Sequence, residues 1–187
     1  MLQVFDSIGA LTLAINHYLQ GKPAGLSLGQ IARTRIDAEK RLLLLPGAEE
    51  LDLNPDQVST PNLYECCRWT AMIYALAVVY PMPDNFNVLQ VYVARLKAAI
   101  EDTNILSSSC QPKSVSDTLL WIFVLGGIAA IDKPERPWFV TQLGLLVKTL
   151  KVDWNCIKEV LDPFLWLDSA CGDSGRHLWT QVEYLAS

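Results

Sequence analysis

One stretch of the chain, LLWIFVLGGIAAIDKPERPWFV at Leu119–Val140, constrains the fold more than any other. Its first part is almost entirely apolar and contains the adjacent pair Gly126 and Gly127. A membrane-spanning helix needs about 20 consecutive apolar residues, and this run, bracketed by Asp117 and Asp132, is shorter. It predicts instead a central helix that is hydrophobic on every side because other helices surround it.

Composition and charge narrow the class of protein. The 187 residues are 51% hydrophobic and 19% charged, which excludes general disorder and predicts one domain over residues 1–187. The net charge of −5 argues against direct binding of nucleic acid by this segment. The basic residues between positions 33 and 41 alternate with acids, as on a solvated helix face. The N-terminus lacks the basic region of a signal peptide, and no membrane association is expected.

The five cysteines show no metal-binding pattern. None forms a CxxC pair, and their spacing does not supply four convergent zinc ligands. Neither a metal nor a cofactor is therefore expected. Free, mostly buried thiols in a reducing compartment are predicted for Cys66, Cys67, Cys110, Cys156 and Cys171.

Apolar residues recur at helical spacing along the whole chain, and alternating strand patterns are scarce. The prediction is an all-α fold, an irregular bundle of about eight helices. The expected segments are roughly 8–19, 28–45, 60–80, 86–101, 114–131, a helix that begins within 132–137, one after Asp153, and one capped by Asp173. Candidate inward positions include Val91 and Leu96 in the fourth segment and Leu178, Val182 and Leu185 in the last.

Several side chains predict where helices begin and end. Ser27 and Gln30 form a capping box, and Thr60 with Pro61 is a cap followed by a first-turn proline. Ser114 with Asp117 predicts a second capping pattern, before the central helix. Asp153 is a further predicted cap. Pro163 is expected to kink the helix that begins after Asp153 or to split it in two. Capping residues and prolines predict the ends of helices only to within a few residues.

The glycine pair has two interpretations. Gly126 and Gly127, with Ala130, let another helix approach closely, and the segment at 60–80 offers Ala71 and Ala75 at matching spacing. Alternatively, the missing side chains leave a hole that a ligand fills, lined by Trp121 and Phe123.

A charged pair stands out in an otherwise apolar segment. Glu65 and Arg68 are three residues apart and therefore neighbours on one helical face. A structural ion pair is the first interpretation, with Asp168 or Arg136 as a second partner. The functional interpretation is that the pair orients a hydroxyl or carbonyl of a ligand at the end of an apolar pocket. The candidate ligand-binding residues are Glu65, Arg68, Trp69, Trp121, Gly126, Gly127, Trp138 and Trp166, although each tryptophan is more typical of a core.

No motif indicates an enzyme. His17 and His177 lie at opposite ends of the chain, and there is no nucleophile elbow, phosphate-binding loop or HExxH sequence. If the protein were a catalyst, the carboxylates of Glu65 and Asp168 would be the candidates for acid–base chemistry.

Three stretches resemble one known family. NLYECCRWTAMIYALAVVYPMP is similar to the tyrosine–glutamate–cysteine–arginine helix in the regulatory region of fungal-specific zinc-cluster (Zn2Cys6-type) transcription factors. The Leu119–Val140 stretch resembles the same family's tryptophan helix, glycine pair and proline–glutamate–arginine hinge. FLWLDSACGDSGRHLW resembles its closing motif. Together they span about residues 60–180 in the family's order, whereas the first sixty residues match only loosely.

The resemblance implies an all-helical regulatory domain, located C-terminal to the zinc cluster, that senses effectors, self-associates and controls transcription. Some relatives bind sterol-like apolar molecules. The sequence departs from the family in lacking the cysteine-rich zinc cluster, so it is expected to be either an excised regulatory domain or a stand-alone homologue. The implied location is the nucleus, or the cytoplasm for a stand-alone protein. Pro163 is a further departure.

The leading hypothesis is therefore a regulatory domain that binds a small apolar effector and forms a homodimer. The alternative is a stand-alone cyclase or isomerase acting on an apolar natural product of secondary metabolism. A third hypothesis is a pure dimerisation module with no ligand.

Overall fold

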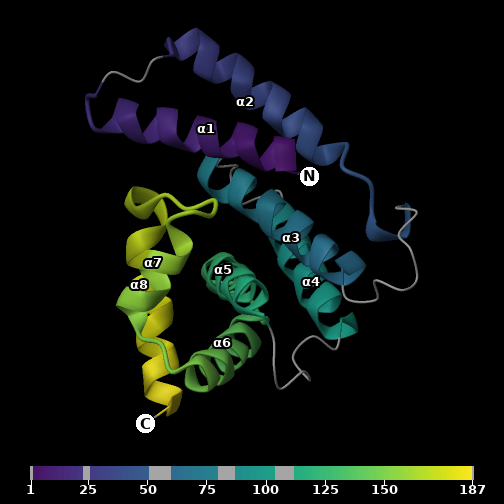
Figure 1. The fold of residues 1–187 in the computed structure, drawn as a ribbon, viewed down its shortest axis with the longest axis vertical. Coiled ribbons are helices and arrows are strands. Elements are labelled where there is room, and N and C mark those ends of the chain that lie inside the picture. Colours follow the sequence, from purple (N-terminus) through teal and green to yellow (C-terminus); the bar gives the residue numbers. More distant parts are fainter. Residues whose placement is uncertain (1, 23–25, 51–59, 80–86, 104–111, 187) are drawn as a thin grey trace.

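Helix α5, Lys113–Ala129, runs through the centre of the molecule. In the computed structural model, which describes residues 2–22, 26–50, 60–79, 87–103 and 112–186, every residue from Leu119 to Gly127 is buried. Figure 1 shows α5 almost end-on, enclosed by helices from both halves of the chain. It contacts α3, α4, α6, α7 and α8. The prediction of a buried central helix is confirmed.

The described residues form helices and no strands, which confirms the all-α class and the number of helices expected. The elements are α1 Leu2–Leu19, α2 Leu28–Leu43, the short 3₁₀ turn η1 Ala48–Glu50, α3 Thr60–Tyr74, the π-helical turn η2 Ala75–Val79, α4 Val88–Asp102, α5, α6 Arg136–Leu150, α7 Trp154–Leu161 and α8 Asp168–Ala186. Within the described ranges, each helix falls short of the length and hydropathy that a bilayer crossing requires.

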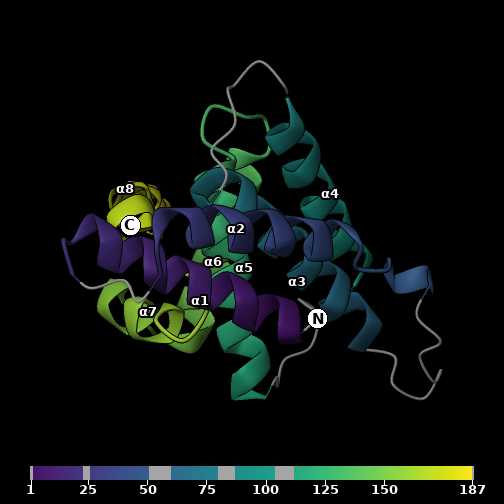
Figure 2. The same cartoon turned by 90° about the horizontal axis from the view of Figure 1, so that it is seen from above.

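The helices associate as pairs around α5. α1 and α2 lie side by side at one end of the molecule, as both Figure 1 and Figure 2 show, while α3 packs along α4. α6 and α8 pack on each other and on α5. One continuous apolar core joins the two halves, with Leu11, Tyr74, Leu96, Trp121 and Phe139 among its most buried members.

Two of the predicted caps are present. Gln30 N donates to Ser27 Oγ at 3.3 Å, and Ser27 N donates to Gln30 Oε1 at 2.8 Å, which completes the capping box of α2. Asp153 Oδ1 accepts from Cys156 N at 2.9 Å at the start of α7. α7 ends at Leu161 and α8 begins at Asp168, so the chain around Pro163 does separate two helices. The side chains of Thr60 and Pro61 lie outside the described part of the structure, so the predicted cap at these residues stays a prediction.

Two predicted caps are wrong. Asp173 lies inside α8, five residues after the helix begins at Asp168. At α5 the N-cap position is Pro112 and no side chain caps the helix. Asp117 instead pairs with Lys113 at 2.8 Å, an i,i+4 contact on the helix surface.

Two predicted inward positions are also wrong. Val91 is 53% exposed, because α4 turns Val93, Leu96 and Ile100 toward the core. Leu185 is 61% exposed in the last turn of α8, which packs on its neighbours through the preceding turns at Leu178 and Val182.

Candidate functional site

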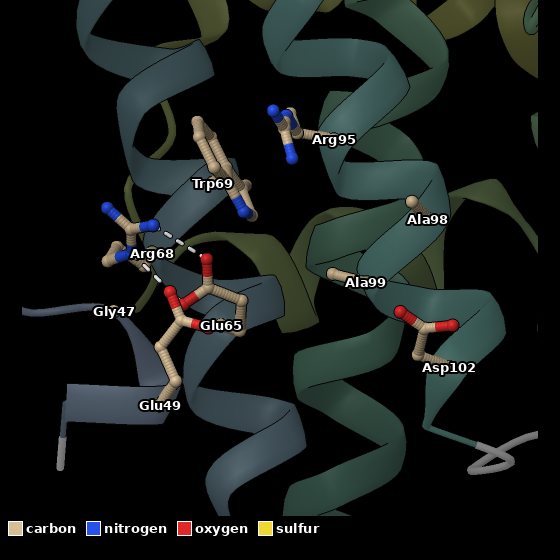
Figure 3. A pocket seen from close by; sticks show the side chains of 9 residues that line it. All are labelled: Gly47, Glu49, Glu65, Arg68, Trp69, Arg95, Ala98, Ala99 and Asp102. Atoms are coloured by element: carbon tan, nitrogen blue, oxygen red, sulfur yellow. Dashed lines mark hydrogen bonds and ion pairs between the residues drawn. The ribbon is translucent and has the colours of Figure 1, made fainter.

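A groove of about 410 Å³ lies between α3, α4 and η1. Figure 3 shows its side chains: Glu65, Arg68 and Trp69 project from α3, with Trp69 on the side of Arg95 and Arg68 on the side of Gly47 and Glu49. Residues at i, i+3 and i+4 share one face of a helix, which explains why these three α3 residues line the same wall. The rest of the lining is Arg95, Ala98, Ala99 and Asp102 of α4, with Glu49 of η1 and Gly47 just before it. The groove therefore combines three of the predicted ligand-binding residues.

The Glu65–Arg68 ion pair organises the α3 wall. Arg68 Nη2 donates to Glu65 Oε1 at 2.6 Å and Arg68 Nε donates to Oε2 at 3.1 Å, a two-point contact that fixes both side chains. The hydrogen bonds to Glu65 raise the pKa of Arg68, and burial opposes that change. The guanidinium also lies over the Trp69 ring, 4.6 Å from its centroid. Trp69 in turn contacts Tyr92 of α4 with ring centroids 5.5 Å apart.

The predicted second partners of this ion pair are located elsewhere. Asp168 Oδ1 pairs with Lys158 Nζ of α7 at 3.1 Å, and Arg136 lies at the junction of α5, α6 and α8. The expectation of Asp168 or Arg136 beside Glu65 is therefore wrong. Sequence spacing predicted the local pair correctly, but it contains no information about which remote helix contacts that pair.

Arg136 has a structural task that the sequence did not indicate. Its Nη1 donates to the carbonyl of Gly127 and its Nε donates to Gln181 Oε1 at 2.8 Å. The cation thus satisfies a carbonyl in the last turn of α5, where the helix dipole is negative, and joins that turn to α8. Burial lowers the pKa of Arg136.

Side chains of the protein occupy the space in front of the glycine pair. A Cβ on Gly126 would lie 2.8 Å from Phe139 Cζ and 3.0 Å from Leu96 Cδ2, and one on Gly127 would lie 2.7 Å from Leu178 Cδ2. Close packing is confirmed, but the partners come from α4, α6 and α8 instead of Ala71 and Ala75 of α3. A ligand at these glycines would require Phe139 or Leu178 to move, and that role stays a prediction.

The remaining predicted tryptophans are dispersed. Trp121 is 1% exposed, and its Nε1 donates to the Leu165 carbonyl at 3.1 Å. Trp138 lies half-buried against Phe139, with Lys97 Nζ 5.6 Å from its ring centroid. Trp166 is buried at a separate cleft of about 360 Å³. The structure therefore does not gather Trp121, Trp138 and Trp166 with Trp69 in one pocket.

The two candidate catalytic carboxylates belong to different hollows. Glu65 lines the α3–α4 groove, whereas Asp168 lines the cleft beside Trp166, and the two sets of lining residues share no member. Each carboxylate is ion-paired. A catalytic role for either one stays a prediction. Among the described residues, no three or more His, Cys, Asp or Glu side chains are grouped so that they could hold a metal.

Of the four described cysteines, Cys66 and Cys171 are buried and Cys67 is partly buried. Burial raises the pKa of Cys66 and of Cys67 to about 12, with smaller contributions at Cys66 from Cys67 and Glu65, and it raises the pKa of Cys171 to about 11. Such thiols stay protonated and unreactive near neutral pH. Cys156 is exposed, and Cys110 lies outside the described residues.

Comparison with known proteins identifies the class to which this all-helical fold belongs. The family model for the fungal specific transcription factor domain matches residues 2–159. The chain belongs to this family, which supports a regulatory role in transcription. No curated protein and no solved structure matches the chain significantly. The match includes the first sixty residues, where the sequence motifs fit only loosely, and it ends before the predicted closing motif at 164–179.

Proposed function

We propose that this chain is the effector-sensing part of a fungal transcription regulator and that a small ligand binds in the α3–α4 groove. One observation supports the proposal most directly. Glu65, Arg68 and Trp69, which the sequence singles out, line the groove together with Arg95 and Asp102 of α4. The groove volume of about 410 Å³ is within the range of small-molecule sites.

The lining defines the chemistry of the ligand. The Trp69 ring and the two alanines of α4 offer a flat apolar surface. The Arg95 guanidinium donates hydrogen bonds, and the carboxylates of Glu49 and Asp102 accept them. Donors and acceptors in one groove suit a neutral molecule with an apolar, planar body and with hydroxyl or carbonyl groups at its edge.

Sensing requires that the ligand bind one conformation better than another. The groove walls belong to separate elements, with α3 and α4 on opposite sides and η1 at one end. A ligand that contacts all three would favour the arrangement in which they are close. The equilibrium shifts only by the difference between the ligand's affinities for the two arrangements.

A thermal-shift screen of neutral polycyclic natural products tests the proposal. A ligand that raises the melting temperature should bind Arg95→Ala and Asp102→Asn at least about tenfold more weakly by calorimetry, the loss of one good hydrogen bond to a charged group. Arg176→Ala, an exposed arginine on α8, is the matched control and should bind normally. Equal affinity of all variants would contradict the groove assignment.

We also propose that the domain self-associates as a homodimer and acts in the nucleus. Large apolar side chains are exposed on the outer helices, among them Leu13, Leu19, Ile36 and Leu43, at 55%, 63%, 50% and 57%. Light scattering on the purified protein measures the oligomeric state. A fluorescent fusion expressed in a fungal cell measures the location, and a monomer excluded from nuclei would refute both parts.

A further inference from the structure

We infer that a second site, separate from the α3–α4 groove, binds a small uncharged apolar molecule in the cleft between α5 and α7. The cleft has a volume of about 630 Å³, larger than the groove. Its walls come from the first turns of α5, the α6–α7 junction, one face of α7 and the segment that follows α7. None of its lining residues belongs to the groove, so the two sites can be tested independently.

Six of the eleven lining residues are apolar, and the others supply polar or charged groups, a combination found in small-molecule sites. Four residues of α5 share one face of that helix at i, i+3, i+4 and i+7, and they supply one wall: Lys113, Ser116, Asp117 and Leu120. The facing apolar surface is formed by Leu150, Val152, Val160, Pro163 and Phe164.

One hydroxyl lies on the α5 wall of the cleft. Ser116 is only 7% exposed and lines the cleft, and its hydroxyl can both donate and accept a hydrogen bond. A ligand carbonyl at this depth would accept a hydrogen bond from Ser116.

The aromatic wall of the cleft is held in place from behind. The Phe164 ring stacks on Trp121, with centroids 5.5 Å apart and an interplanar angle of 18°. Trp121 is itself fixed by its hydrogen bond to the Leu165 carbonyl. The wall therefore exists before a ligand arrives, and binding does not require Phe164 to be ordered first.

The rim selects against charged ligands. Lys113 Nζ is paired with Asp117 Oδ2 at 2.8 Å, so this cation is already neutralised. Glu159 adds a further negative charge at the cleft. An anion would be repelled, and a cation would find no buried carboxylate, because the interior offers only apolar side chains and the Ser116 hydroxyl.

Cys156 provides the means of testing this site. It lines the cleft and is exposed, whereas Cys66 and Cys171 are buried and Cys67 is partly buried. In a Cys110→Ser background, iodoacetamide should label Cys156 first. The probe is Nile red, a neutral planar dye with one carbonyl group. We expect saturable one-to-one binding with blue-shifted emission, and at least fivefold slower alkylation of Cys156 at saturating dye.

Two variants fill the cleft from opposite walls. Ser116→Leu on α5 and Val160→Trp on α7 should each weaken Nile red binding at least tenfold and remove the protection of Cys156. Ser114→Leu is the matched control, an exposed serine on the same helix, and should bind the dye as the parent does. Because Val160 is only half-buried, its variant keeps the test usable if Ser116→Leu does not fold.

The outcomes separate this site from the groove. Arg95→Ala and Asp102→Asn should leave Nile red binding unchanged, whatever effect they have on a groove ligand. Failure of the dye to bind or to protect Cys156 in the folded protein would overturn the inference. So would binding that both cleft-filling variants retain, or binding that only the groove variants abolish.

Discussion

Gly126 and Gly127 make room for large side chains from other helices. Phe139 of α6 and Leu178 of α8 each enter the volume that a Cβ would occupy on α5. In an interior packed as densely as an organic crystal, such an interlock leaves no space for even one added methyl group. The absence of two side chains on α5 thus positions two neighbouring helices.

Gly126→Ala should destabilise the protein by about 1–3 kcal/mol, because overpacking displaces Phe139 and Leu96. Gly144→Ala is the matched control on α6, where a new Cβ would lie no closer than 3.8 Å, to Val182 Cγ1. That variant should gain about 0.5–1 kcal/mol from reduced backbone entropy of the unfolded chain. Urea unfolding followed by circular dichroism measures both, and equal changes in the two would refute the packing account.

The buried thiols make stability depend on alkaline pH. In the folded protein the pKa of Cys66 and of Cys67 is raised to about 12 and that of Cys171 to about 11, against 9.0 ordinarily. Between these values the unfolded chain loses protons that the folded chain keeps. The contribution of these thiols to the free energy of unfolding should therefore be constant below about pH 8.5 and fall above it, by at most about 1.4 kcal/mol per pH unit for each thiol.

Urea titrations at several values from pH 7 to pH 10 test this dependence. Cys67→Ala and Cys171→Ala should each make the alkaline decline less steep. Cys156→Ala, which removes an exposed thiol, should leave the slope unchanged. A slope that is the same in all three variants would show that other groups cause the decline.

At the scale of elements, α7 depends strongly on its N-terminal cap. It has only 8 residues, and isolated helices shorter than about 12 residues are marginal in water. Asp153→Ala removes the acceptor for Cys156 N and should lower the melting temperature and speed hydrogen exchange of the α7 amides. Asp173→Ala, inside α8, should change neither. Exchange that is equally fast in both variants would contradict this role of Asp153.

The cap also gives α7 an acid sensitivity. The hydrogen bond from Cys156 N lowers the pKa of Asp153 below its ordinary value. The stabilisation is present above that ordinary value and is lost as the pH falls through the lowered one. Asp153→Asn keeps a side-chain acceptor at all pH values and should remove this part of the acid dependence.

Sequence patterns predicted the helices well and their exact ends less well. The capping box at Ser27 and the cap at Asp153 depend on residues three positions apart, so the sequence alone is enough to predict them. Asp173, which lies near Gly172 and Gly175, is of a residue type preferred at N-caps, yet it lies inside α8. In the structure the glycines pack inside α8, where a Cβ on Gly175 would lie 2.7 Å from Trp154. A glycine that accommodates a remote tryptophan cannot be distinguished from a helix terminator without tertiary contacts.

In the candidate site, too, the sequence predicted contacts within one helix but not contacts between helices. Glu65, Arg68 and Trp69 could be placed on one face because helical spacing alone brings them together. Arg95 and Asp102 could not be assigned to the groove, since their position depends on how α4 packs on α3. The partners of the glycine pair were misjudged for the same reason: small residues indicate close approach without specifying which side chain approaches.

At the scale of the molecule, α8 belongs to the folding unit even though the family match ends at residue 159. Its buried residues Leu178 and Val182 pack against α5 and α6, and Leu178 fills the space at Gly127. A chain of residues 1–161 should therefore lose cooperative urea unfolding. A chain ending at Glu183 should retain it, because Tyr184 and Leu185 are exposed. Cooperative unfolding of the shorter chain with an unchanged midpoint would refute this.

The stacked pair of Trp121 and Phe164 gives the protein an optical reporter of its own. Trp121 is almost fully shielded from water, and the ring it stacks on forms part of the α5–α7 cleft wall. Any molecule that shifts Phe164 must change the electronic surroundings of this indole. Binding of a ligand in the cleft should thus change the near-ultraviolet circular dichroism of the unlabelled protein. The Phe164→Leu variant should lose this ligand-induced change.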